Sequence, residues 1–198
     1  DRWYAVFCNY ADHCTARIEK NGESAMKQIL IIVDMQNDFI DGSLGTKEAQ
    51  AIVSNVAKKI KEYKDRGDKI IFTRDTHDTN YLNTPEGKKL PVEHCIFGTH
   101  GWKIADGLEV ENCYYVDKPT FGWTHWNDLI FEDEIELVGL CTDICVVSNA
   151  LILKATFPNA DITVDASCCA GVTPETHKAA LETMKMCQIE VIGENNEV

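Results

Sequence analysis

Three side chains capable of nucleophilic chemistry stand at or just beyond the ends of apolar, strand-like segments. Asp34 ends the run ILIIVD, Lys118 ends CYYVDK, and Cys145 follows EIELV. A cysteine becomes a nucleophile when a base removes its proton, and a neighbouring cation stabilises the thiolate. Each residue alone is more often structural, as a cap, a solvated charge or a buried thiol. Together, at corresponding positions on three strands, they predict an Asp–Lys–Cys catalytic site.

The segment GLCTDICVVSNALILK, residues 139–154, places Cys145 between a strand and a helix. We expect Gly139 to end the strand and Thr142 or Asp143 to cap a helix that runs on from Ile144. Free N–H groups and the positive end of the helix dipole would then stabilise a thiolate and lower the pKa of Cys145. The alternative interpretation is an inert cysteine buried in the helix.

A second group of polar residues occupies the long irregular stretch 74–100. Asp75 and His77 lie two residues apart, so an extended backbone puts both on one side. With His94 they offer a carboxylate and two imidazoles, which suit Zn²⁺, Mn²⁺ or Fe²⁺. Asp and His also cap loops and turns, so the residues alone leave both interpretations open. His100 and His125 are expected at the surface or in a pocket wall.

The elements that carry these side chains alternate between strands and helices. Apolar runs predict strands at 29–34, 69–73, 113–118, 134–138, 161–165 and 189–192. Helices are predicted from Thr46 to Gly67, from Ile144 onward and from Pro174 onward, with short helices over 101–108 and 123–130. This alternation predicts an α/β fold, a three-layer sandwich around an open, mostly parallel sheet. Ligands bind such sheets at the carboxyl ends of the strands, where the three candidate residues stand.

The composition is ordinary for a globular protein and restricts the expected partners. A net charge of −13 argues against nucleic acid and anionic membranes. Nine cysteines, an odd number, without a recognisable export signal predict reduced thiols in the cytoplasm. Residues 1–25 lack the pattern of the rest and are expected to be a lead-in segment of unknown role, while 26–198 are expected to form one domain.

Five spaced motifs resemble one protein family. They are DMQNDF at 34–39, TRDTH at 73–77, PVEHC at 91–95, KPTFGW at 118–123 and GLCTDICV at 139–146. In this order, over nearly all of 26–198, they are similar to the isochorismatase-like cysteine hydrolases, and among these to the nicotinamidases. The resemblance implies a Rossmann-like sheet and a catalytic triad of Asp34, Lys118 and Cys145. It also implies a cis peptide between Leu140 and Cys141, with the backbone N–H groups of Cys141 and Cys145 forming an oxyanion hole.

The same resemblance implies a divalent metal as cofactor. In nicotinamidases the counterparts of Asp75, His77 and His94 hold a metal that binds the ring nitrogen of the substrate. We expect Zn²⁺ here, with Mn²⁺ or Fe²⁺ as alternatives. Glu86 lies between these motifs, where some members supply a further ligand.

The expected substrate pocket departs from the nicotinamidase pattern in two places. Leu90 stands where a tryptophan usually stacks on the pyridine ring, and His100 stands where a proline is usual. Phe39 could supply one ring face, and Trp123 or Trp126 could replace the other. The residues expected to line the pocket are Phe39, Leu90, Trp123 and Ile144.

The activity implied by the resemblance is hydrolysis of nicotinamide to nicotinate and ammonia through a thioester, as in NAD salvage. One alternative is the same fold acting on another amide or on a ureido compound. The other is a non-catalytic protein that binds small molecules and has kept the fold. The expected partners are a small amide and further copies of this chain, in a homo-oligomer.

Overall fold

Six strands form the central sheet of this computed structural model, which describes residues 28–194. All strand pairs in this range are parallel, and the strands lie side by side in the order β3-β2-β1-β4-β5-β6. The strands are β1 (Gln28–Val33), β2 (Lys69–Asp75), β3 (Tyr114–Lys118), β4 (Glu134–Leu140), β5 (Asp161–Ala170) and β6 (Glu190–Ile192). The predicted lead-in segment, residues 1–25, lies outside the described residues.

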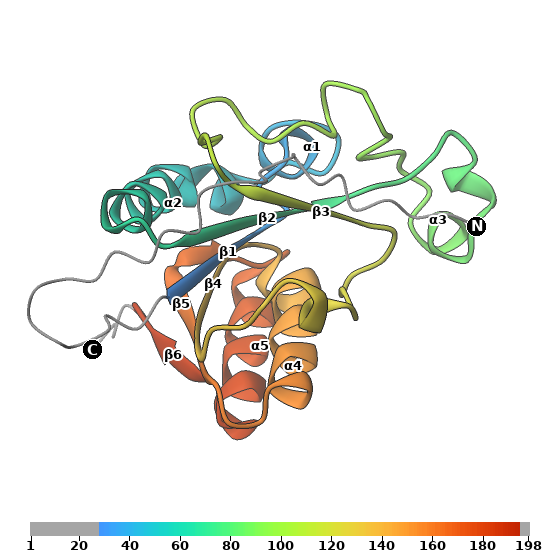
Figure 1. The fold of residues 1–198 in the computed structure, drawn as a ribbon. Coiled ribbons are helices and arrows are strands. Elements are labelled where there is room, and N and C mark those ends of the chain that lie inside the picture. Colours follow the sequence, from blue (N-terminus) through green and yellow to red (C-terminus); the bar gives the residue numbers. More distant parts are fainter. Residues whose placement is uncertain (1–27, 195–198) are drawn as a thin grey trace, which may run out of the picture.

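Helices cover both faces of the sheet (Figure 1). On one face the core contains Ile29 and Ile31 of β1 together with residues of α4 (Val147–Thr156) and α5 (Pro174–Met186). On the other face Leu30 and Ile32 share a core with residues of α2 (Lys47–Arg66). A strand buried on both faces reads as an unbroken apolar run, which is how β1 was predicted. The predicted three-layer α/β fold is confirmed.

The long helix α2 begins and ends where the sequence predicts. Oγ1 of Thr46 accepts a hydrogen bond from the backbone N–H of Ala49 at 3.0 Å, which caps the first turn. Gly67 follows the last turn with a φ of +76°, a left-handed conformation that glycine adopts without steric cost. The helix α5 likewise begins at Pro174, after the capping residue Thr173.

Gly139 does not end its strand as predicted, because β4 continues to Leu140. Gly139 has a φ of +116°, and a Cβ there would lie 2.2 Å from the carbonyl oxygen of Val33. Glycine therefore lets β4 approach β1 closely at the end of the sheet, next to Asp34. The strand is irregular here, since its register with β5 shifts between Leu137 and Gly139.

Three other predicted boundaries also need correction. The predicted helix over 101–108 is absent; these residues form turns whose backbone bonds to segment 35–38, as in the bond from the N–H of Asn37 to the carbonyl of Lys103. Residues 123–130 contain only the short 3₁₀ turn η2 (Trp126–Asp128). The strand β5 runs to Ala170, five residues beyond its predicted end at 165. Tertiary contacts, which periodicity does not report, decide all three.

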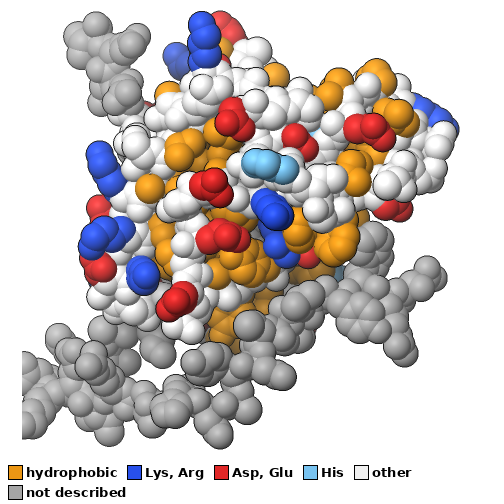
Figure 2. Space-filling model, turned by 90° about the horizontal axis from the view of Figure 1, so that it is seen from above, with side chains coloured by type: hydrophobic (Ala, Val, Ile, Leu, Met, Phe, Trp, Pro, Cys, Tyr) orange, Lys and Arg blue, Asp and Glu red, His pale blue; other side chains and the backbone are white. Residues whose placement is uncertain are grey.

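The surface carries charged and apolar side chains together. On the face seen from above Figure 1, acidic and basic side chains are interspersed with apolar ones (Figure 2). Among the helices of residues 28–194, none combines the length and the apolar character needed to span a bilayer.

Candidate active site

Lys118, the last residue of β3, lies between the other two candidate catalytic residues. Its Nζ is 2.6 Å from Oδ2 of Asp34 and donates to Sγ of Cys145 at 3.4 Å. Asp34 directly follows β1, and Cys145 lies five residues beyond β4. Asp34 and Lys118 are fully buried, and Cys145 is 5% exposed. The structure thus brings the three predicted residues together at the carboxyl edge of the sheet.

Burial and neighbouring charges set the protonation states of these groups. Burial opposes a charge on Lys118, but Asp34 and Cys145 outweigh it and raise the pKa of the ammonium group. Burial raises the pKa of Asp34, and Lys118 offsets this only in part. Burial also raises the pKa of Cys145 well above its usual value, while Lys118 acts in the opposite direction. The resting site therefore holds a cationic lysine beside a neutral thiol.

Cys145 lies in a single π-helical turn, η3 (Thr142–Val146), that precedes α4. The predicted caps are wrong, because the carboxylate of Asp143 accepts a hydrogen bond from the N–H of Val172 at 3.0 Å and Thr142 contacts His177. The predicted lowering of the thiol pKa by a helix start is also wrong in this resting state, since burial raises it. The carbonyl of Cys145 is fixed by Nδ2 of Asn149 at 2.8 Å.

Asp34 is held in a backbone conformation that non-glycine residues seldom adopt, with a φ of +46°. Its N–H lies 3.2 Å from both the carbonyl oxygen and Oγ1 of Thr73, and that hydroxyl donates to Oδ1 of Asp34 at 2.7 Å. These bonds leave Oδ2 directed at Lys118. The peptide between Leu140 and Cys141 is cis, as the family resemblance implies.

Four side chains of metal-binding type converge beside this triad. One donor atom each from Asp75, His77, Glu86 and His94 lie within 4.8 Å of one another. Oδ2 of Asp75 is 3.0 Å from Nε2 of His77 and 3.5 Å from Nε2 of His94. Oε1 of Glu86 lies 3.8 Å and 4.0 Å from the same two nitrogens. Glu86, which the sequence left open, therefore belongs to the same cluster.

The cluster fits a divalent transition metal. Two imidazoles and two carboxylates suit Zn²⁺, Mn²⁺ or Fe²⁺. Nδ1 of His94 pairs with the carbonyl of Val92 at 2.8 Å, which turns Nε2 toward the cluster. Oδ1 of Asp75 is buried and has no hydrogen-bond partner among the described residues, although Nζ of Lys118 lies 3.7 Å away. Buried oxygens normally have partners, so this one is suited to a cation.

The segment 34–39 supports the metal cluster as well as the triad. Oε1 of Gln36 accepts the N–H of Asp75 at 2.7 Å, and its Nε2 donates to the carbonyl of Asp75 at 2.9 Å. Oδ2 of Asp38 accepts the N–H of Cys95, next to His94, at 2.8 Å. A Cβ on Gly101 would lie 2.0 Å from that carboxylate oxygen, so only glycine leaves room for this contact. Asp75 and the backbone next to His94 are thus both tied to the residues that follow β1.

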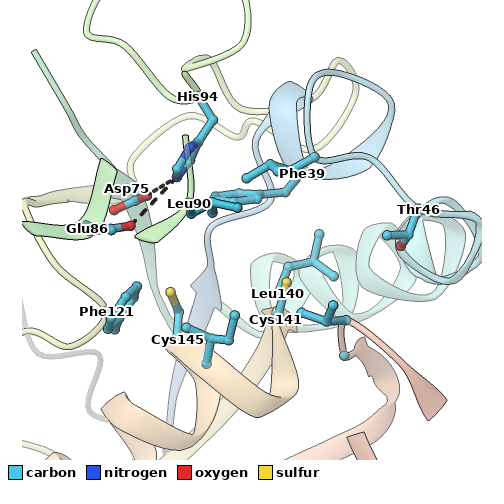
Figure 3. Close-up of a pocket in the computed structure, with 14 residues that line it drawn as sticks. Phe39, Thr46, Asp75, Glu86, Leu90, His94, Phe121, Leu140, Cys141 and Cys145 are labelled. Atoms are coloured by element: carbon cyan, nitrogen blue, oxygen red, sulfur yellow. Dashed lines mark ion pairs between the residues drawn. The ribbon is translucent and has the colours of Figure 1, made fainter. Parts of the chain in front are cut away.

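A cavity of about 280 Å³ is lined by Cys145 of the triad and by Asp75, Glu86 and His94 of the metal-type cluster (Figure 3). This is near the small end of the roughly 300–1,000 Å³ typical of ligand pockets. The thiol of Cys145 and the carboxylates and imidazole of the metal cluster face the same space. The lining residues are Phe39, Leu44, Thr46, Asp75, Glu86, Leu90, His94, Phe121, Leu140, Cys141, Ile144, Cys145, Gly171 and Val172.

The structure places three of the four predicted pocket residues in this wall: Phe39, Leu90 and Ile144. Trp123 is not among the lining residues; it packs against the core, and its backbone N–H donates to Oδ1 of Asn149 at 2.9 Å. Trp126 is fully buried. Neither tryptophan therefore replaces the ring that Leu90 lacks. His100 and His125 are exposed and do not line the cavity.

Several lining residues were missed from the sequence. Phe121 lies two residues before Trp123, inside the motif KPTFGW, so its aromatic ring is the signal that could have identified it. Val172 follows the unpredicted extension of β5. Leu44 lies in the turn before α2, and nothing in the local pattern marks either of these two residues.

Comparison with known proteins places these features in a wider group. Residues 28–195 match the family described as the isochorismatase domain. A nicotinamidase/pyrazinamidase from Mycobacterium tuberculosis is 28% identical over 186 residues, which cover 82% of this chain and 97% of that protein. A protein from Arabidopsis thaliana named a probable inactive nicotinamidase is 30% identical over 180 residues, covering 79% and 87% respectively. The crystal structure of nicotinamidase/pyrazinamidase PncA from Bacillus subtilis superposes with a TM-score of 0.75 at 27% identity, covering 84% and 99%.

Proposed function

Because this chain belongs to the isochorismatase family, we propose that it is a cysteine-dependent amidohydrolase, and specifically a nicotinamidase that converts nicotinamide to nicotinate and ammonia. One observation carries the proposal. Lys118 lies within 2.6 Å of Asp34 and 3.4 Å of Cys145, and Cys145 lines a cavity whose wall also includes three residues of the metal-type cluster. A nucleophile thus faces the same small pocket as ligands for a metal, with a base and a cation buried directly behind it.

The first half of the reaction forms a thioester. Asp34, whose pKa is raised by burial, takes the proton of the Cys145 thiol. The thiolate, stabilised by the ammonium group of Lys118, attacks the carboxamide carbon. The oxyanion of the tetrahedral intermediate is stabilised by the backbone N–H groups of Cys141 and Cys145. When the C–N bond breaks, Asp34 returns the proton to the nitrogen and ammonia leaves.

The second half of the reaction regenerates the thiol. Asp34, again ionised, takes a proton from a water molecule that attacks the thioester carbon. The C–S bond breaks, Cys145 recovers its proton, and the carboxylic acid leaves. Lys118 keeps its charge throughout, because Asp34 and Cys145 raise its pKa against the effect of burial.

Asp75, His77, Glu86 and His94 would hold the metal, with Oδ1 of Asp75 as a further candidate donor. A metal held by these residues would supply a Lewis acid for a ring nitrogen of the substrate. Phe39, whose ring centroid is 5.6 Å from that of His94, would lie against the substrate ring. Fixing the ring matters because small misplacements of a reacting group cost orders of magnitude in rate.

The direct test measures the release of ammonia from nicotinamide by the metal-loaded protein. The same assay is applied to Cys145→Ala and, as a control, to Lys61→Met, a substitution on the exposed surface of α2. We expect turnover by the parent and the control and none by Cys145→Ala. A thioester is tested by trapping: hydroxylamine added to the reaction should divert nicotinamide to the hydroxamate. Turnover by Cys145→Ala at the parent rate would contradict the mechanism.

A second candidate function is hydrolysis of another amide or of a ureido compound by the same triad. Leu90 favours it, because it leaves the substrate ring without the tryptophan that nicotinamidases are expected to use. A panel of small amides and ureido compounds, screened for ammonia, separates the two.

The third candidate is a non-catalytic binding protein, and the relative from Arabidopsis thaliana shows why it needs testing. A pure binder has no use for a thiol held beside a buried base and cation. The screen decides this case too, since a binder would retain nicotinamide in equilibrium dialysis and release no ammonia.

A further inference from the structure

The cavity extends well beyond the space between Cys145 and the metal-type cluster. Its charged wall residues, Asp75, Glu86 and His94, lie together at one end. Figure 3 shows Thr46 on the far side of the cavity from Glu86, with Phe39 and Leu140 in between. We call this second part the apolar arm and define it by five uncharged lining residues, Leu44, Thr46, Leu140, Ile144 and Val172. Leu44 and Thr46 directly precede α2, and Val172 follows Ala170, which pairs with Leu140 in the sheet.

The apolar arm offers a substrate almost nothing but hydrocarbon. None of its five side chains is charged, and the hydroxyl of Thr46 already accepts the N–H of Ala49 at 3.0 Å. The acidic and imidazole groups all belong to the other end. Any part of a ligand that enters the arm must therefore be uncharged, because a charge there would lose its hydration without gaining a partner.

Three apolar side chains in the cavity wall are also partly exposed. Leu90 is 38% exposed, Phe121 is 42% exposed and Val172 is 51% exposed. Exposed apolar surface beside a pocket is typical of a ligand groove. Leu90 is expected beside the ring of nicotinamide itself, so Phe121 and Val172 offer further apolar surface to a larger ligand.

We propose that the apolar arm is a subsite for an uncharged, apolar ring substituent, so that the best substrates are aromatic carboxamides larger than nicotinamide. The inference rests on the proposed function, since it places the carboxamide at Cys145 and the ring nitrogen at the metal-type cluster. The substituent points away from the cluster, toward Leu44 and Val172. The reaction is unchanged: the amide C–N bond breaks and ammonia leaves.

Binding tests the subsite separately from turnover. Metal-loaded Cys145→Ala protein would be titrated by calorimetry with nicotinamide and with its ring-substituted methyl, ethyl and propyl derivatives. Each buried methylene should tighten binding about fourfold, from ~0.8 kcal/mol per CH₂. A carboxymethyl derivative of matching length should lose this gain. Equal affinities along the alkyl series at every ring position would overturn the subsite.

Two variants locate the effect in the arm. Val172→Phe and Leu44→Phe should each reduce the ratio of propyl to unsubstituted affinity by at least tenfold. Leu82→Phe is the matched control, because Leu82 is 45% exposed and does not line the cavity. An unchanged ratio in both arm variants, with folding verified by circular dichroism, would refute the assignment.

Turnover distinguishes failure of the subsite from failure of the proposed function. Release of ammonia from nicotinamide, with no gain from any substituent in binding or in kcat/KM, would overturn only the subsite. Tighter binding of the alkyl series, without ammonia from any amide, would support the subsite and overturn the proposed hydrolase.

Discussion

Replacing Lys118 with methionine removes the only cation that contacts both Asp34 and Cys145 among the described residues. Its Nζ is fully buried, 2.6 Å from Oδ2 of Asp34 and 3.7 Å from Oδ1 of Asp75. Breaking a buried ion pair by removing one partner costs ~3–5 kcal/mol, because the remaining charge is left uncompensated. For a domain of this size that corresponds to a fall in Tm of roughly 6–20 °C.

The loss of stability in Lys118→Met should depend on pH, and its direction follows from the pKa of Asp34. Lys118 is the largest influence that lowers the pKa of Asp34 against burial. Without it, the folded-state pKa of Asp34 rises further above its unfolded value of about 3.9. When the pKa of a group is higher in the folded protein than in the unfolded chain, the free energy of unfolding falls as the pH rises from the unfolded-state pKa through the folded-state pKa. The destabilisation of Lys118→Met should therefore be small near pH 4 and largest above pH 7.

The assay is urea unfolding of parent and variant between pH 4 and pH 8, with chelator present so that metal binding does not contribute. Lys61→Met is the matched control: Lys61 pairs with Asp65, but its side chain is 73% exposed. Exposed pairs of this kind contribute at most about 0.5 kcal/mol. Adding Asp34→Asn to Lys118→Met should recover part of the lost stability at pH 7.5. A loss below about 0.5 kcal/mol at pH 7.5, or one independent of pH, would refute the reasoning.

Four further outcomes are expected. Cys145→Ala should abolish ammonia release while keeping the circular dichroism spectrum and nearly the parent Tm. Chelation and His94→Gln should each suppress hydrolysis of nicotinamide and lower the amount of bound metal measured by mass spectrometry. Benzamide, which lacks the ring nitrogen, should be a poor substrate both with and without chelator. Asp38→Asn should weaken metal binding ~10–100-fold by loosening the turn at Cys95, which a competition titration measures. Leu90→Trp should lower KM for nicotinamide more than it changes kcat, because stacking acts on substrate and transition state alike. A rise in KM would contradict this interpretation of Leu90.

The inner strands of the sheet were predictable because they are buried on both faces. All side chains of an unbroken apolar run such as ILIIV are buried when both faces of the strand are covered, and a polar residue directly after the run marks the end of the strand. Asp34 and Lys118 were found by that logic, and Asp75 and His77 by their spacing. Thr46 and Gly67 were found because caps are local signals that do not depend on the rest of the chain.

What could not be predicted depends on contacts between distant segments. The absent helix at 101–108 is an example: its backbone bonds instead to Asn37 and its neighbours, sixty residues earlier in the sequence. The pattern predicts Trp123 as a pocket ring, but its side chain packs against the core, and its backbone N–H bonds to Asn149. The raised pKa of Cys145 likewise follows from burial, which a helix-start pattern does not reveal.

The segment 34–39 has a consequence for how such a protein can diversify. It supplies Asp34 to the candidate triad, holds Asp75 through Gln36 and the backbone next to His94 through Asp38, and supplies Phe39 to the cavity wall. A substitution there would disturb several parts of the site together. Leu44, Leu90, Phe121 and Val172 instead come from four separate loops that share no such duties. We expect that evolution or design can change the accepted amide at these positions, one loop at a time, while the bond-breaking machinery stays fixed.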